Sequence, residues 1–172
     1  YLYWAADWQF RRVHRALHAE GIGLNLDLAV GVIREGAEVW CDRQLFARDV
    51  QIGAPPDGFA PDGQRWGLAA LHPVELRDRA YRPFIAILRA SMPLEGIVRI
   101  DHVMQLFRLY WAGDAGGAYV RYAHRELLAI LALESRRRRC TVVGEDLGTV
   151  EPGVRTALAR ANILSSRVLY FE

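Results

Sequence analysis

The sequence has 172 residues, of which 52% are apolar and 24% charged, a balance that indicates one globular domain and excludes a disordered chain. All 22 basic residues are Arg, and the net charge of +2 gives no argument for binding nucleic acid or a membrane. The two Cys indicate neither a disulfide framework nor a metal site, and we find no pattern of a membrane span or of a signal peptide in these residues. Because the chain begins at Tyr1 and ends on VLYFE, we expect it to be a piece of a longer protein.

The first half of the chain is predicted to contain helices, a strand and a long loop. Ala6, Phe10, Val13 and Leu17 follow helical spacing, whereas LNLDLAV alternates with the period of two that is typical of a strand. The expected elements are a helix over 3–20, a strand over 24–30, a loop over 49–67 and a helix over 73–92 that breaks or restarts at Pro83. The segment 49–67 is rich in Gly and Pro, and loops of this length are usually functional or disordered.

The second half is predicted to alternate strands with helices. The expected elements are a strand over 97–101, a polar glycine loop over 113–117, a helix over 124–138, a strand over 141–145, a helix with Pro152 in its first turn, and a strand over 167–171. Strand-like runs separated by helical patterns predict an α/β fold with parallel strands. We find no internal repeat and no low-complexity linker.

Charged residues at the ends of the apolar runs mark a candidate site. Asp27, Asp101 and Glu145 come at or near the ends of three predicted strands, where parallel α/β folds bind their ligands. Paired carboxylates suit glycosyl transfer, because one ionised carboxylate attacks the anomeric carbon while a protonated one gives its proton to the leaving oxygen. Arg99 lies two residues before Asp101 on the same strand face and would keep Asp101 ionised.

Structural roles for the same residues stay open at this point. Asp101 could simply pair with Arg99 or Arg108, and Glu145 could cap the helix that follows it. The remaining candidates for ligand contact are Trp66, Tyr110 and Trp111. Each could stack on a sugar ring or pack inside the protein.

Other motifs favour structural roles. The run SRRRR over 135–139 ends a predicted helix, where cations are favoured, so a solvated helix end explains it better than nucleic-acid binding. His14 and His18 lack an HExxH pattern and indicate an exposed helix face rather than a metal site. Gly144 and Gly148 match neither phosphate-loop pattern.

Four motifs together resemble the 4-α-glucanotransferases, also called amylomaltases or disproportionating enzymes, of the bacterial maltodextrin-utilising type. In chain order they are LDLAVGV…GAEVW, GAPPDGFAPDGQRWG, VRIDHV and VVGEDLGTV, and the similarity runs over essentially the whole chain. The family belongs to the α-amylase clan and has a (β/α)₈ TIM barrel. The resemblance implies that residues 1–172 are the central part of the catalytic barrel, roughly strands three to six, with the 49–67 loop in the substrate channel.

The resemblance also implies roles for individual residues. Asp101 is expected to be the catalytic nucleophile and Glu145 the general acid/base. The expected substrate-binding residues are Asp27 at the −1 sugar, Arg99 and His102 on either side of the nucleophile, and Gln64 and Trp66 in the loop that overhangs the glucan channel. No metal ion and no cofactor is implied. The sequence GLAALHP after Trp66 departs from the family's Asn-Pro-Leu-Tyr, which leaves the acceptor contacts open.

The implied activity is retaining transfer of α-1,4-glucan segments between maltodextrins. The expected partners are maltooligosaccharides and α-1,4-glucans, with no nucleic acid or membrane, in the cytoplasm. The family's third catalytic carboxylate is expected beyond this chain, and so are the first barrel strands. We therefore expect the chain alone to be inactive and to self-associate through open barrel edges. The alternative is a non-catalytic α/β fragment that binds carbohydrate or has no activity.

Overall fold

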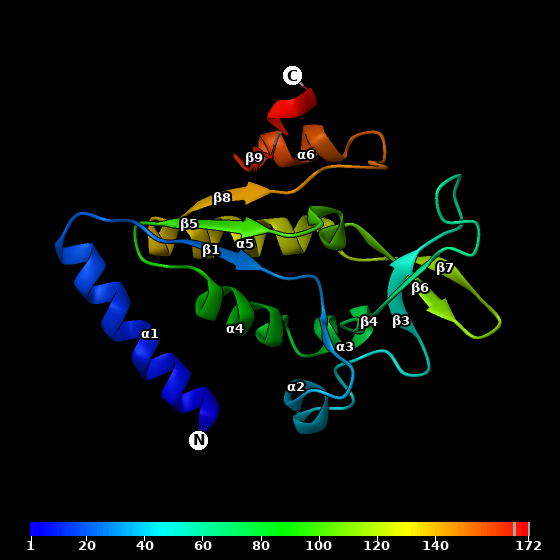
Figure 1. Cartoon of the computed structure of the whole chain (residues 1–172), viewed down its shortest axis with the longest axis horizontal. Helices are drawn as coiled ribbons and strands as arrows, with labels where there is room; N and C mark the ends of the chain where they lie inside the picture. The colour runs from blue at the N-terminus through cyan, green and yellow to red at the C-terminus, as the bar shows by residue number, and fades with distance from the viewer. Residues whose placement is uncertain (167, 172) are drawn as a thin grey trace.

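The computed structural model describes residues 1–166 and 168–171, and within them the strands form two sheets that share an apolar core (Figure 1). The strands are β1 (Asn25–Leu28), β2 (Val32–Ile33), β3 (Gln51–Ala54), β4 (Gln64–Ala69), β5 (Ile97–Ile100), β6 (Arg108–Gly113), β7 (Gly116–Arg121), β8 (Thr141–Gly144) and β9 (Leu164–Ser165). The helices are α1 (Leu2–Ala19), α2 (Ala37–Cys41), α3 (Pro73–Asp78), α4 (Arg82–Ser91), α5 (His124–Arg138) and α6 (Val154–Arg160), with 3₁₀ turns η1 (Val103–Leu106) and η2 (Leu169–Phe171). The α/β prediction is confirmed.

The first sheet is parallel, with strand order β1-β5-β8-β9. In its second strand, Val98 and Ile100 are fully buried in the core, to which α5 contributes Leu127 and Leu131. Because successive strand residues point to opposite faces, Arg99 projects from the other face of the sheet. The helical segments predicted over 3–20, 73–92 and 124–138 correspond to α1, to α3 with α4, and to α5, and Pro83 lies in the first turn of α4 as expected of a helix restart.

The second sheet is antiparallel, with strand order β2-β4-β3-β6-β7, and it was not predicted as a unit. The prediction of a loop over 49–67 is wrong at both ends of that range, because β3 and the start of β4 lie within it. The physical reason is pairing with distant residues, since Ile52 pairs with both Leu68 and Trp111. Gly53 permits this pairing because a side chain there would collide with the backbone carbonyl of Gln64.

The glycine loop predicted over 113–117 is the turn of a β-hairpin whose strands β6 and β7 were not predicted. Tyr110 pairs across the hairpin with Tyr119, their ring centroids 5.4 Å apart in an edge-on arrangement. Gly117 leaves room for the Tyr110 ring, against which any side chain at that position would press. The hairpin is therefore stabilised by cross-strand contacts that a local pattern does not reveal.

The carboxyl-terminal elements also differ from the prediction. The strand expected over 167–171 is wrong: β9 is Leu164–Ser165, and Leu169–Phe171 forms a 3₁₀ turn, while Arg167 lies outside the described residues. The Ser166 amide donates to the Gly144 carbonyl at 3.0 Å, so the pairing with β8 occurs earlier in the chain. The helix after β8 begins at Val154, so that Pro152 precedes its first turn instead of lying in it.

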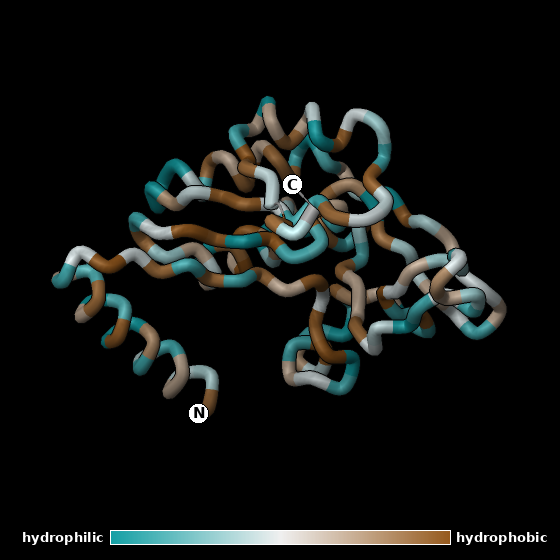
Figure 2. Tube along the Cα trace, turned by 45° about the horizontal axis from the view of Figure 1, so that its top comes forward, coloured by the Kyte–Doolittle hydropathy of each residue, from teal (hydrophilic) through white to brown (hydrophobic). Residues whose placement is uncertain are grey.

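Helix α1 forms as predicted but does not pack against the sheets. None of the residues that the structure describes in α1 is buried, and Trp4 and Trp8 are 63% and 45% exposed. Figures 1 and 2 show the helix as an arm that leaves the body of the molecule. Among the described residues, no helix combines the length and the apolar character that crossing a membrane requires.

Candidate active site

The parallel sheet brings Asp27, Asp101 and Glu145 to the carboxyl ends of neighbouring strands. Asp27 lies in β1, Asp101 directly follows β5, and Glu145 directly follows β8. The ladder of backbone bonds continues through the last two, because the Asp101 amide donates to the Leu28 carbonyl and the Glu145 amide to the Ile100 carbonyl, both at 2.9 Å. The predicted placement at one edge of the sheet is confirmed.

Arg99 joins two of these carboxylates. Its Nη1 donates to Asp27 Oδ1 and Oδ2 at 2.7 and 2.9 Å, and its Nη2 donates to Asp101 Oδ1 at 2.8 Å. The hydrogen bond to Asp27, and then the one to Asp101, raises the pKa of the Arg99 guanidinium although burial opposes them. Arg108, the other candidate partner of Asp101, pairs with Glu151 at 3.1 Å instead. A permanently charged group therefore lies against Asp101.

Glu145 points toward the segment that follows Asp101. Its Oε2 accepts from the His102 amide at 2.9 Å and its Oε1 from the Leu147 amide at 3.0 Å, and its carbonyl accepts from the Val103 amide at 2.9 Å. The alternative that Glu145 caps the following helix is wrong, because α6 is preceded by Gly153 and has no side-chain cap. These bonds bring Glu145 next to the residue that follows Asp101.

His102 lies between the two acidic residues and the antiparallel sheet. Its backbone has φ 45° and ψ 64°, the left-handed conformation that few non-glycine residues adopt. Desolvation lowers the pKa of the His102 imidazole, although the charges of Glu145 and Asp101 oppose that change. The imidazole is therefore neutral near pH 7.

Trp66 and Gln64 reach the same place from β4. The Trp66 ring meets the His102 ring edge-on, with centroids 5.5 Å apart, and Trp66 Nε1 donates to Gln64 Oε1 at 2.9 Å. The unpredicted antiparallel sheet thus supplies one wall of the site. Tyr110 packs on Tyr119, and Trp111 lies 6.0 Å from His72 between ring centroids, so the structure gives both of them packing contacts within the protein.

Residues that the sequence reasoning missed support this edge of the sheet. Gln105 Nε2 donates to the Asp101 carbonyl at 2.7 Å, and Asp146, next to Glu145, is almost fully buried. The contact of Gln105 could have been expected from its spacing, one helical turn after Asp101. Asp146 could have been noticed in the GEDLG motif, where it directly follows Glu145 and so lies on the opposite side of the chain.

The run of arginines lies away from this site, at the end of α5. Arg136–Arg138 form the last turn of α5, where Arg137 pairs with Glu134 at 2.7 Å, in agreement with a helix end. Among the described residues no three His, Cys, Asp or Glu side chains gather as a metal site.

Comparison with known proteins agrees with these observations. A family model described as 4-alpha-glucanotransferase matches residues 1–172. The 4-alpha-glucanotransferase of Haemophilus influenzae is 45% identical over 177 residues, which cover 99% of this chain and 25% of that protein. The 4-alpha-glucanotransferase of Mycobacterium tuberculosis is 43% identical over 178 residues, which cover 100% of this chain and 25% of that protein. The chain thus spans about a quarter of the length of these curated relatives.

Solved structures show the same fold. The crystal structure of amylomaltase from Corynebacterium glutamicum superposes with a TM-score of 0.89 at 39% sequence identity, covering 98% of this chain and 25% of that one. Amylomaltase from Streptococcus agalactiae, solved in complex with acarbose, superposes with a TM-score of 0.80 at 20% identity and covers 95% of this chain and 35% of that one. The second likeness supports the fold alone.

Proposed function

Because the chain belongs to the 4-alpha-glucanotransferase family, we propose that it carries the nucleophile and the general acid/base of a retaining glucanotransferase. The observation that carries this proposal is the arrangement of Asp101 and Glu145 after neighbouring parallel strands, joined through the His102 amide at 2.9 Å from Glu145 Oε2. The full-length enzyme that contains this segment is called the parent enzyme below. Its proposed substrates are maltooligosaccharides and α-1,4-glucans.

Asp101 is proposed as the nucleophile. The Arg99 guanidinium donates to its carboxylate at 2.8 Å and holds it in place, and its side chain is 38% exposed, so that a sugar can reach it. In the first step Asp101 would attack the anomeric carbon, and the bond to the leaving oxygen would break as the glucosyl ester forms.

Glu145 is proposed as the acid that protonates the leaving oxygen and then as the base that accepts the proton of an incoming sugar hydroxyl. A sugar hydroxyl, in place of water, completes the transfer and leaves the anomeric configuration unchanged. Asp27 and Arg99 are proposed to bind the −1 sugar beside Asp101. His102, Gln64 and Trp66 are proposed to line the glucan channel, which the contact between the Trp66 and His102 rings supports. The chemistry needs no cofactor.

The parallel strands are proposed to be four consecutive strands, roughly the third to the sixth, of a (β/α)₈ barrel. The edge strands β1 and β9 each have one open side among the described residues, which supports pairing with further strands of the parent enzyme. We also propose that the parent enzyme acts in the cytoplasm on free maltodextrins, without nucleic acid as a partner.

Disproportionation of maltotriose by the parent enzyme tests the proposal. Asp101→Asn and Glu145→Gln should each lower the formation of glucose and longer dextrins by several orders of magnitude. Asp7→Asn is a matched control, since Asp7 forms an exposed pair with Arg11 on α1 at 2.7 Å and should leave turnover unchanged. If both site variants keep the activity of the control, the proposal is wrong.

A second candidate is that the chain by itself is a non-catalytic α/β unit. The open edges and the unpacked helix α1 favour it for the isolated chain. Inactivity of the isolated chain agrees with both candidates, so the parent enzyme decides between them. If the segment is non-catalytic there as well, the parent enzyme would turn over maltotriose equally well with and without the two carboxylates.

A further inference from the structure

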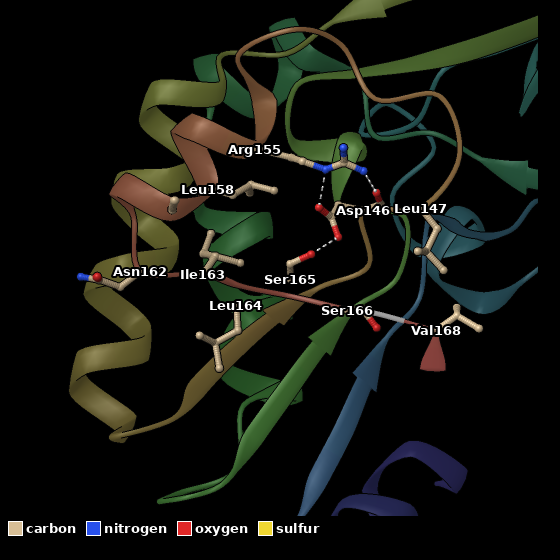
Figure 3. A pocket seen from close by; sticks show the side chains of 11 residues that line it. Asp146, Leu147, Arg155, Leu158, Asn162, Ile163, Leu164, Ser165, Ser166 and Val168 are labelled. Carbon is tan, nitrogen blue, oxygen red and sulfur yellow. Dashed lines mark hydrogen bonds and ion pairs between the residues drawn. The ribbon is translucent and has the colours of Figure 1, made fainter. Parts of the chain in front are cut away.

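Asp146 is a buried carboxylate directly after Glu145. It is 2% exposed and is, with Glu134, one of two buried charged side chains among the described residues. Ser165 Oγ donates to Asp146 Oδ1 at 2.6 Å, and Arg155 Nε donates to Oδ2 at 3.0 Å, as Figure 3 shows. Both carboxylate oxygens are thus bound by donors from β9 and α6, which follow it in the chain.

These contacts hold Asp146 ionised although it is buried. Burial alone would raise the pKa of Asp146, but the Ser165 hydroxyl and then the Arg155 guanidinium outweigh burial and hold that pKa below its usual value. Arg155 Nη2 also donates to the backbone carbonyl of Asp146 at 3.1 Å. A single arginine therefore binds both the side chain and the main chain of this residue.

The next amide links Asp146 to the proposed acid/base. The Leu147 amide donates to Glu145 Oε1 at 3.0 Å, while Oε2 accepts from the His102 amide at 2.9 Å, so the two amides together orient the carboxyl. The Leu147 side chain is 42% exposed and Gly148, with φ +78°, begins the turn away from the sheet. The Asp146 carbonyl, which Arg155 Nη2 binds, belongs to the same planar peptide group as the Leu147 amide, so the contacts of Asp146 hold this amide in place.

The loop that begins at Asp146 is also held at Glu151. Glu151 pairs with Arg108 at 3.1 Å and with Arg121 at 3.2 Å, both on the β6–β7 hairpin. The beginning of the loop is therefore held by Asp146 against β9 and α6, and its end by the hairpin. Between the two anchors, the Leu147 amide donates the hydrogen bond that joins this loop to the Glu145 carboxyl.

We propose that Asp146 is a positioning residue, which by binding Ser165 and Arg155 fixes the Leu147 amide and so orients the Glu145 carboxyl for proton transfer. This inference rests on the proposed acid/base function of Glu145. Asp146 itself touches no reacting atom. Its loss should therefore slow only the steps that need a proton from Glu145, and spare bond cleavage that needs none.

Donors with different leaving groups separate these effects in the parent enzyme. Maltotriose needs a proton on its leaving oxygen, whereas the fluoride of α-maltosyl fluoride leaves without one. For the first, glucosyl-enzyme-forming step, Asp146→Asn should lower the rate with maltotriose about 100-fold, the scale of a misplaced catalytic group, and the rate with the fluoride less than about 3-fold. Ser165→Ala should act in the same direction, about 10-fold on maltotriose.

Glu134→Gln is the matched control, because Glu134 is equally buried between Arg89 and Arg137 but lies on α5, away from the site. It should change both donors by the same factor, and thermal denaturation checks that each variant is folded. If Asp146→Asn does not fold, Ser165→Ala and Arg155→Gln decide in its place. Equal losses with both donors, or no loss with either, would overturn the inference.

Glu145→Gln distinguishes a failure of the positioning inference from a failure of the acid/base assignment. If this variant discriminates between the donors and the Asp146 variants do not, only the positioning inference fails. If Glu145→Gln itself slows both donors equally, the acid/base assignment fails and the inference with it.

Discussion

The Arg99 guanidinium donates to the Asp101 carboxylate at 2.8 Å, from a residue two positions earlier on the same face of β5. The same guanidinium also binds Asp27 on the neighbouring strand at 2.7 Å. One cation therefore sets the position of two carboxylates, one of which is the proposed nucleophile. The relationship ties the chemistry of Asp101 to the parallel pairing of β1 with β5.

Removal of this cation should disable the proposed nucleophile. Arg99→Gln in the parent enzyme should lower the rate of the first step about 100-fold for maltotriose and by a similar factor for α-maltosyl fluoride, because the nucleophile acts with either leaving group. Arg139→Gln removes an exposed pair with Glu95, 2.8 Å away before β5 begins, and should leave both rates unchanged. Unaltered rates in the Arg99 variant would show that Asp101 does not depend on it.

The lowered pKa of His102 predicts a pH dependence of stability. Below the ordinary imidazole pKa of about 6.5, the unfolded chain binds a proton that the folded protein resists, so the free energy of unfolding should fall as the pH falls from about 7 to 5. His102→Gln cannot titrate and should lose part of this dependence. Urea denaturation of the parent enzyme and the variant at several pH values measures it. The same slope in both proteins would exclude His102 as the cause.

The isolated chain should self-associate and have no transferase activity. Its edge strands β1 and β9 are open among the described residues, and Trp4, Leu164 and Leu169 are each more than half exposed, which leaves apolar surface and strand edges to pair with other copies. Sedimentation velocity at rising concentration should show species larger than 19.5 kDa. A monomer that disproportionates maltotriose would contradict both parts of this prediction.

Local patterns predicted the placement of Asp101 and Glu145 better than they predicted the antiparallel strands beside them. Asp101 and Glu145 end β-branched runs, and the parallel pairing of those runs follows from the alternation of strands with helices, so their common edge could be predicted. The contact between Trp66 and His102 could not, because it depends on β4 pairing with β3 and β3 with β6, residues that are distant in the chain. Strand β9 has only two residues, too few to leave a periodic signal in the sequence. The hydrogen bond from Ser165 in β9 to Asp146 could therefore not be predicted either.

Mass spectrometry of the intact parent enzyme carrying Glu145→Gln tests whether Asp101 is the nucleophile and Glu145 the acid/base. With α-maltosyl fluoride, this variant should form the covalent intermediate and then stall, because no base remains to activate the acceptor. One maltosyl group should accumulate, and peptide mapping should place it on Asp101, while the Asp101→Ala variant should form no adduct. An adduct on the Asp101→Ala variant, or a sugar attached to another residue of the Glu145→Gln variant, would contradict the account.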